Sequence, residues 1–184
     1  MKALFHHPLP LNPNATSASG IRPERMLHAF RKLGYHVDVI AGHAGERKAA
    51  IKKVKKNIND GVRYDFMYAE SSTMPTILTE RHHLPIHPLM DWKFFRFCKI
   101  NAIPTGLFYR DIFWLFEEYR SELNTAKVLV AKLAYLFDLW WYQQTLTKLY
   151  VPSIEMGKYI PTVSSDKFAA LPPGHSAPSV IPSC

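Results

Sequence analysis

Short apolar runs alternate with amphipathic segments along most of this 184-residue chain. The apolar runs are rich in β-branched and aromatic side chains, which predicts buried strands at 2–7, 35–42, 63–70, 103–111, 149–153 and 167–174. Segments with helical spacing of apolar residues lie between them, at 21–34, 45–60, 73–83 (a short helix or turn), 88–100, 126–148 and 154–160. A strand, a crossover helix and a second strand within about 40 residues indicate a right-handed βαβ unit. The pattern therefore predicts an α/β fold with a parallel sheet flanked by helices.

The segment 126–148 is apolar enough to be compared with a membrane span. Lys132 and Asp138 interrupt its most apolar part, whereas a span needs about 20 apolar residues with few charges. We therefore predict a helix that is buried against the sheet. Gly106 in the fourth predicted strand indicates close approach of another backbone.

Composition narrows the class of protein. Apolar residues make up 47% of the chain and aromatic residues 13%, which excludes intrinsic disorder. Cys98 and Cys184 are too few and too far apart for a disulfide framework, and the first residues lack the apolar run of a secretory signal, so a cytoplasmic location is expected. We expect one domain at 1–175 and a tail or interdomain linker at 176–184.

Candidate chemistry gathers where the predicted strands end, because parallel α/β sheets bind ligands at the carboxyl ends of their strands. A histidine there can hydrogen-bond a sugar or phosphate oxygen or accept a proton, a carboxylate can act as a general base, and an arginine can pair with phosphate. Asp111 could instead only tie loops together. The candidates are His6 and His7 after the first strand, Glu70, Ser71 and Ser72 after the third, and Arg110 and Asp111 after the fourth.

The first loop is the other candidate for anion binding. It holds one glycine, Gly20, where a dinucleotide fingerprint needs three, and no phosphate-binding P-loop motif is present. Gly20 nevertheless lies near the start of a predicted helix, which attracts anions, and Arg22 and Arg25 add positive charge. The alternative is an ordinary helix entry.

Three histidines at 82, 83 and 87 suggest a metal site at first sight. Adjacent imidazoles in an extended segment point to opposite faces, and only Glu80 lies at a spacing that could complete a ligand set. We therefore predict hydrogen-bonding or packing roles for His82, His83 and His87, and no metal.

The formal net charge of +8 implies an acidic partner or surface. Lys48, Lys52, Lys55 and Lys56 share one face of the helix predicted at 45–60. Such a face is either simply solvated or adheres to an anionic membrane, where each basic residue contributes about 1 kcal/mol. A nucleic-acid partner is not expected, because no aromatic residues are interleaved with the basic run.

Five stretches together resemble one family. They are HHPLPLNPNATSASGIRPERMLHAFRKLGYHVDVIAG, ESSTMPTILTERHHLPIHP, GLFYRDIFWLFEEY, KLYVPSIEMGKYI and LPPGH, in this order. Taken together they resemble the N-terminal domain of retaining glycosyltransferases of the GT-B fold, of the bacterial surface-polysaccharide type. The resemblance runs from Met1 to about His175, and it implies that the parallel sheet is Rossmann-like.

The resemblance also implies a function. The N-terminal half of such an enzyme binds a glycan or lipid-linked acceptor, and a C-terminal half, expected to be absent from this chain, holds the nucleotide-sugar donor. The chain alone would then be inactive, and no cofactor is implied besides the donor as substrate. The protein would act at the inner membrane as a peripheral protein. A non-catalytic module that binds glycan or an anionic membrane is the alternative.

Residue roles carry over by position. Gly20 matches the loop glycine that lets backbone amides approach the donor diphosphate, and Arg22 stands beside it. The acceptor contacts of the family fall at strand-end positions, which here are occupied by His6 or His7, Glu70 and Arg110.

Overall fold

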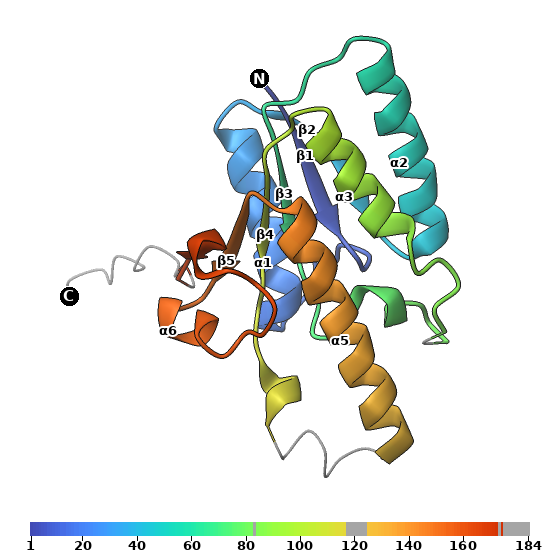
Figure 1. The fold of residues 1–184 in the computed structure, drawn as a ribbon. Coiled ribbons are helices and arrows are strands. Elements are labelled where there is room, and N and C mark those ends of the chain that lie inside the picture. Colours follow the sequence, from blue (N-terminus) through green and yellow to red (C-terminus); the bar gives the residue numbers. More distant parts are fainter. Residues whose placement is uncertain (83, 117–124, 173, 175–184) are drawn as a thin grey trace, which may run out of the picture.

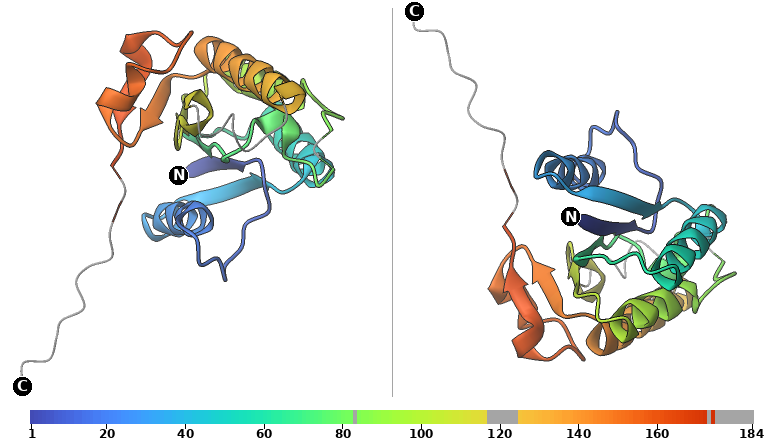
Figure 2. Two further views of the ribbon diagram at one scale, coloured as in Figure 1. Left: turned by 90° about the horizontal axis from the view of Figure 1, so that it is seen from below. Right: turned by 90° about the horizontal axis from the view of Figure 1, so that it is seen from above.

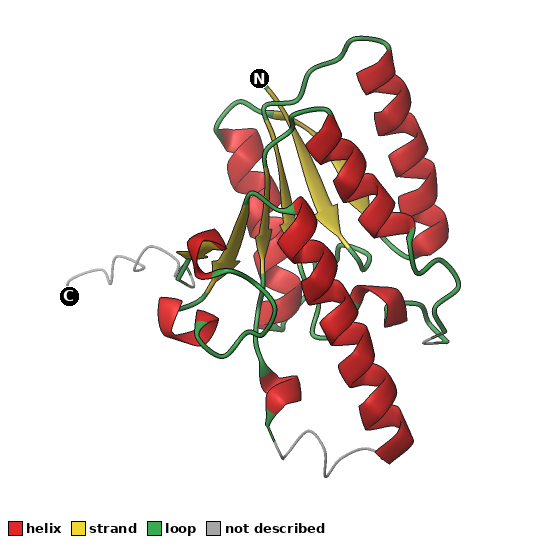
Figure 3. Ribbon diagram, viewed as in Figure 1, coloured by secondary structure: helices red, strands yellow, loops and turns green. Residues whose placement is uncertain are grey.

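The molecule is built around a parallel β-sheet (Figures 1 and 3). The computed structural model describes residues 1–82, 84–116, 125–172 and 174. All neighbouring strand pairs in this sheet are parallel, which confirms the predicted α/β fold class. In the described residues the sheet has the order β2-β1-β3-β4-β5-β6, with β1 at Lys2–His7, β2 at His36–Ala41, β3 at Phe66–Glu70, β4 at Thr105–Phe108, β5 at Lys148–Val151 and β6 at Phe168–Ala170.

The helices cover the two faces of the sheet unequally (Figure 2). Helix α1 lies on one face, and α2, α3 and α5 lie on the other, which gives the predicted Rossmann-like arrangement. The long helices are α1 at Ala18–Lys32, α2 at Ala44–Asn59, α3 at Met90–Ile100 and α5 at Thr125–Thr145. Short connectors are η1 at Thr76–Leu78, η2 at Phe113–Leu115, α6 at Ile154–Gly157 and η3 at Ser165–Lys167.

Two hydrophobic cores follow from the alternation of side chains along the strands. Leu4 of β1 faces the cluster that contains Ile51 of α2 and Leu139 of α5. Its neighbour Phe5 faces the opposite cluster, with Leu27 of α1. Complete burial of a side chain such as Leu139 contributes about 1.5–3 kcal/mol, so the strands need apolar residues on both faces.

The strand order reverses at β1, since β2 pairs with one of its edges and β3 with the other. In open parallel sheets the crevice outside the carboxyl ends of the strands at such a reversal is the usual ligand site. The carboxyl ends of β1 and β3 carry His7 and Glu70. The topology therefore places the candidate residues at the point where function is expected.

Some predicted elements differ in extent from the observed ones. In the predicted helix or turn at 73–83, Thr76–Leu78 forms a 3₁₀ turn. The carboxylate of Glu80 accepts from the backbone N–H of Ala44 at 2.6 Å. The helix predicted at 21–34 begins earlier, at Ala18.

The predicted helix at 126–148 is α5, and it packs on the sheet through its buried side. None of the described helices is long and apolar enough to cross a membrane. The predicted tail or linker at 176–184 lies outside the described residues.

Candidate functional site

Glu70, the last residue of β3, is the centre of a polar cluster on the α1 face of the sheet. Its side chain is fully buried, and it lies between two arginines. The Nε atom of Arg22 is 3.3 Å from Oε1, and an Nη atom of Arg110 is 3.5 Å from Oε2. The hydroxyl of Tyr68 donates a hydrogen bond to Oε1 at 3.1 Å. The structure thus brings together Glu70, Arg22 and Arg110, three of the residues singled out from the sequence; we call these three the arginine cluster.

The start of α1 explains how Arg110 is held. Pro23 lies inside this helix and has no N–H group to donate to the carbonyl of Ser19, four residues earlier. Arg110 donates to this carbonyl oxygen at 3.2 Å. A proline inside a helix would otherwise leave an acceptor without a partner, so Pro23 creates the site that fixes Arg110.

Arg22 is held differently, by stacking. Its guanidinium carbon lies 3.5 Å above the ring of Phe108 in β4, and one of its Nη atoms lies 3.4 Å from the hydroxyl of Tyr68. Guanidinium groups stack well on aromatic faces because they are planar and weakly hydrated. Both arginines are therefore oriented by protein contacts before any ligand arrives.

The arginine cluster carries an excess of positive charge, since two guanidinium groups share one carboxylate. Burial raises the pKa of Glu70 above its ordinary value, while the charges of Arg22 and Arg110 oppose this shift. Burial also lowers the pKa of Arg110. Within the described residues, the buried Nε atoms of Arg22 and Arg110 have no hydrogen-bond partner. Because these two atoms are buried, it is the excess positive charge beside the first turn of α1 that favours an anion here.

Gly20 lies in the first turn of α1 and does not present an open surface. Its N–H donates to the carbonyl of Ser17 at 3.0 Å. A Cβ atom at this position would lie 2.5 Å from the Cβ of Ala15. The missing side chain therefore makes room for the preceding loop, and the arginines rather than the Gly20 amide are placed to meet a phosphate.

The remaining strand-end residues mainly order loops. Ser71 accepts from the N–H of Arg110 through its hydroxyl at 3.2 Å, and so joins the ends of β3 and β4. Ser72 donates to the carbonyl of Met74 at 2.6 Å. Asp111 accepts from the N–H of Phe113 at 3.2 Å. None of these three contacts involves the guanidinium group of Arg22 or Arg110.

His6 faces the opposite side of the sheet and belongs to a second polar network, which sequence analysis missed. Its Nε2 atom lies 2.8 Å from an oxygen of Asp91 in α3. Arg47 of α2 binds the same carboxylate at 3.1 and 3.2 Å, and it also donates to the carbonyl oxygens of Pro8 and Gly42, each at 2.6 Å. We call His6, Asp91 and Arg47 the closed network, because all three are buried.

The residues of the closed network determine the pKa of Asp91. Burial alone would raise the pKa of Asp91, but the hydrogen bond from His6 and the charge of Arg47 hold it below its ordinary value. A carboxylate accepts, so the Nε2 atom of His6 donates and the tautomer is fixed. One sequence signal was present: Asp91 shares a helical stripe with Phe94, Phe95 and Cys98, which are completely buried.

His7 follows on the α1 side of the sheet, like Glu70. Its Nδ1 atom lies 2.9 Å from the carbonyl oxygen of Leu9, to which it donates. Burial lowers the pKa of His7 to about 4. This imidazole is therefore neutral near pH 7 and braces the loop that leads to α1.

The histidines of the segment after β3 lie apart from the arginine cluster. His82 and His87 are exposed, and the ring of His82 accepts from the N–H of Leu84 at 3.1 Å. His83 lies outside the described residues. Glu80 caps the start of α2, as stated above, and within the described part of the chain no group of three His, Cys, Asp or Glu residues could hold a metal ion.

The predicted lysine face exists as a surface. Lys48, Lys52, Lys55 and Lys56 line one shallow groove along α2. Two of them already have partners: the ammonium of Lys55 lies 5.0 Å from the ring of Phe97, and Lys56 forms an ion pair with Asp60.

Comparisons with known proteins do not assign the chain to a family. No protein-family model matches the chain. No curated protein is significantly similar to it.

Proposed function

We propose that this chain is the acceptor-side domain of a glycosyltransferase that passes sugar from a nucleotide-sugar donor to a hydroxyl of a cell-surface glycan or lipid-linked acceptor. The observation that supports it most is the convergence of Arg22 and Arg110 on Glu70, beside the start of α1, at the reversal of strand order. The resemblance of the sequence to retaining GT-B enzymes supplies the reaction class.

The chemistry follows from the charges. When the bond between the sugar and the diphosphate breaks, negative charge grows on the leaving oxygen. The oxygen of the acceptor hydroxyl forms the new bond to the sugar, and its proton passes to the leaving diphosphate. Two oriented guanidinium groups stabilise such charge, because their donors are in place before the reaction. They also position the phosphate relative to the acceptor.

Glu70 has a positioning role in this proposal. Both of its oxygens face donors, and its side chain has no exposed surface. A base must reach the proton that it removes. Proton transfer is therefore assigned to neither Glu70 nor the buried His6 and His7, whose predicted catalytic roles have no accessible acceptor atom in this geometry.

A titration tests the binding step. Uridine diphosphate and inorganic pyrophosphate are added to the wild-type chain and to Arg22→Gln and Arg110→Gln, and heat is measured by calorimetry. We expect each variant to lower the affinity at least tenfold, because one charge-assisted contact is lost. Lys48→Gln, on the opposite side of the sheet, is the matched control and retains the wild-type affinity. Unchanged affinity in both arginine variants would place the ligand elsewhere.

A transfer assay tests the reaction class. Radiolabelled nucleotide sugars are incubated with the protein and a bacterial membrane extract, and the label in the glycan and lipid fractions is counted. We expect no incorporation by this chain alone, and incorporation that Arg110→Gln abolishes when the chain is joined to a donor-binding half. Retained binding without incorporation from any donor would favour the alternative of a non-catalytic glycan-binding module.

The lysine groove on α2 favours a second function, adhesion to an anionic membrane. Lys48 and Lys52 are exposed along this groove, and each basic residue near such a surface contributes about 1 kcal/mol. Co-sedimentation with phosphatidylserine vesicles at low salt is expected to fall in the double variant Lys48→Gln, Lys52→Gln. Equal sedimentation with neutral phosphatidylcholine vesicles would argue against this function.

A further inference from the structure

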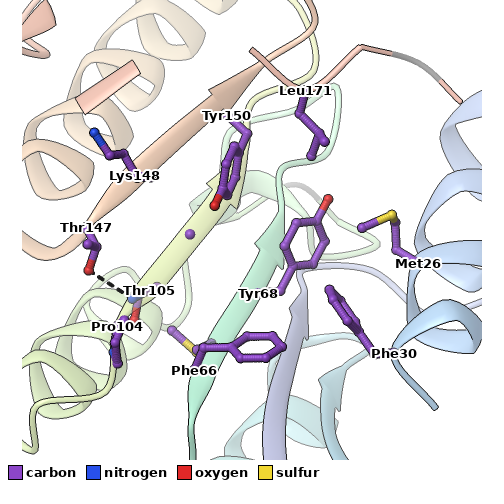
Figure 4. A pocket seen from close by; sticks show the side chains of 12 residues that line it. Met26, Phe30, Phe66, Tyr68, Pro104, Thr105, Thr147, Lys148, Tyr150 and Leu171 are labelled. Atoms are coloured by element: carbon purple, nitrogen blue, oxygen red, sulfur yellow. Dashed lines mark hydrogen bonds between the residues drawn. The ribbon is translucent and has the colours of Figure 1, made fainter. Parts of the chain in front are cut away.

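The α1 face of the sheet contains an apolar pocket of about 400 Å³. It exists because α1 covers only part of this face, whereas the other face is covered by α2, α3 and α5 (Figure 2). Figure 4 shows its walls: side chains of α1, of three neighbouring strands and of the segment after β6 surround one hollow. Its main lining residues are Met26, Phe30, Phe66, Tyr68, Tyr150 and Leu171.

A glycine shapes the floor of the pocket. The sequence predicted that another backbone approaches Gly106, but it is the ring of Tyr150 that does so. A Cβ atom at Gly106 would lie 2.5 Å from a ring carbon of Tyr150. The ring can therefore lie across β4 and form an aromatic wall that faces Tyr68, at 6.5 Å between ring centroids.

The pocket and the arginine cluster follow one another along the direction of α1 and β3. Along α1, Arg22 and Met26 are one helical turn apart. Along β3, Phe66 and Tyr68 line the pocket while Glu70, on the same face, belongs to the cluster. Four strand residues span about 13 Å, so the two sites are separated by the length of a short hydrocarbon chain.

Tyr68 is shared by the two sites. Its ring lines the pocket, and its hydroxyl donates to Glu70 at 3.1 Å. A ligand that lies along the strand direction would therefore contact both sites without crossing another element.

The two sites differ in chemistry. The cluster has one excess positive charge beside the start of α1, and it therefore suits an anion. None of the residues that line the pocket is acidic. Its polar groups are largely engaged: the hydroxyl of Thr147 accepts from the N–H of Thr105 at 3.1 Å, and Lys148 donates to the carbonyl of Asp166 at 2.8 Å. A nucleobase would find few partners there, whereas a hydrocarbon chain needs none.

We infer that the pocket takes the hydrocarbon chain of an anionic amphiphile whose phosphate binds Arg22 and Arg110. This inference goes beyond the proposed function: the amphiphile and the diphosphate of the donor would compete for the same two arginines. The binding itself needs no donor and no reaction.

The test uses n-decyl phosphate, kept below its micelle concentration, with inorganic phosphate and n-decanol as partial ligands. Affinities are measured by calorimetry on the whole chain. We expect decyl phosphate to bind at least tenfold more tightly than either inorganic phosphate or decanol, because it alone occupies both sites.

Two variants separate the two sites. Leu171→Trp fills the pocket from a partly exposed position and is expected to lower the affinity for decyl phosphate at least tenfold while leaving that for inorganic phosphate unchanged. Arg110→Gln is expected to weaken both phosphates. Lys93→Gln, at an exposed lysine of α3 on the other face of the sheet, is the control. Circular dichroism confirms that each variant is folded; Met26→Trp replaces Leu171→Trp should the latter fail to fold.

Three outcomes would overturn the inference. Decyl phosphate could bind no more tightly than inorganic phosphate, or Leu171→Trp could leave its affinity unchanged. In the third, sedimentation would show a dimer that Leu171→Trp dissociates, and a second copy would then cover the pocket. Failure of sugar transfer with binding intact would remove only the proposed transferase activity, so the two proposals fail separately.

Discussion

The arginine cluster and the closed network lie at the same edge of the sheet, on opposite faces, and both join arginine to a buried carboxylate. In the closed network, Arg47 and His6 both bind the carboxylate of Asp91, and Arg47 also donates to two backbone carbonyls. In the arginine cluster, two arginines share Glu70. The number of arginines for each carboxylate, rather than the presence of buried ionic residues, is the difference that makes the arginine cluster the proposed binding site.

The largest expected effect on the free energy of unfolding comes from breaking the closed network. Asp91→Ala leaves the guanidinium of Arg47 buried without its carboxylate, which costs about 3–5 kcal/mol. Urea unfolding followed by circular dichroism measures the loss. The matched double variant Asp91→Ala, Arg47→Met removes both charges and is expected to recover part of the stability. A loss below about 1 kcal/mol for Asp91→Ala would show that the network is not tightly closed.

Asp138 of α5 is a third buried carboxylate that can be compared with Asp91 and Glu70. Among the described residues, hydrogen-bond donors contact it and no cation does. It accepts from the N–H of Thr76 at 2.6 Å and from the indole of Trp141 at 3.1 Å. Burial raises the pKa of Asp138 to about 7, whereas the pKa of Asp91 is lowered. The arginine and the histidine bond of the closed network thus account for the opposite direction of the two shifts.

The second-largest expected effect is on the pH dependence of stability, and unfolding measured at a series of pH values tests it. The folded chain binds a proton on Asp138 more tightly than the unfolded chain, so this group's contribution to stability is full below about pH 4 and is lost as pH rises to about 7. For His7 the folded pKa of about 4 is depressed, so its contribution is lost as pH falls from 6.5 to 4. The Asp138 contribution is worth roughly 4 kcal/mol and the His7 contribution roughly 3 kcal/mol, so the two largely cancel in the wild-type chain.

Two variants reveal separately the opposing contributions of Asp138 and His7 to the free energy of unfolding. Asp138→Asn is expected to lose stability, relative to wild type, as pH falls from 6.5 to 4, because the His7 contribution is no longer opposed. His7→Gln is expected to lose relative stability as pH rises from 4 to 7. The free energy of unfolding is measured across the pH range, and the double variant serves as the control with the pH dependence of the wild type. Parallel curves for both single variants would contradict the assignment.

The smallest expected stability effect concerns the arginine cluster. Arg110→Gln is expected to change the free energy of unfolding by at most about 1 kcal/mol, because part of the side chain is exposed and Arg22 stays with Glu70. Chemical denaturation measures this change beside the loss of anion affinity described above. A loss as large as that of Asp91→Ala would make the cluster a structural element, and the distinction between the two networks would fail.

Sequence analysis singled out the members of the arginine cluster, although not their ion pairs with one another, and it missed the closed network for a physical reason. Glu70 and Arg110 follow apolar runs, and parallel strands deliver their ends to a common edge, so local pattern was enough. Asp91 lies at the start of a helix, and its partners His6 and Arg47 are 85 and 44 residues away. Pairing these residues requires knowing which helices cover β1, which periodicity alone does not give.

The fold class was likewise predictable from alternation, whereas the geometry at single positions was not. Gly20 was expected to expose backbone to a phosphate, but a side chain of the preceding loop fills this space. The role of Pro23, which frees the carbonyl of Ser19 for Arg110, depends on a contact between residues that are 91 positions apart. Tertiary contacts decided both positions.

The pairing of Gly106 with Tyr150 also has an evolutionary consequence. A Cβ atom at 106 would lie 2.5 Å from the tyrosine ring, so a larger residue at 106 requires either a shift of this ring or a smaller residue at 150. Related chains should replace the two together, a bulkier strand residue accompanying a smaller one across from it. A relative that keeps the tyrosine but carries valine beneath it would have to accommodate that ring in a different rotamer.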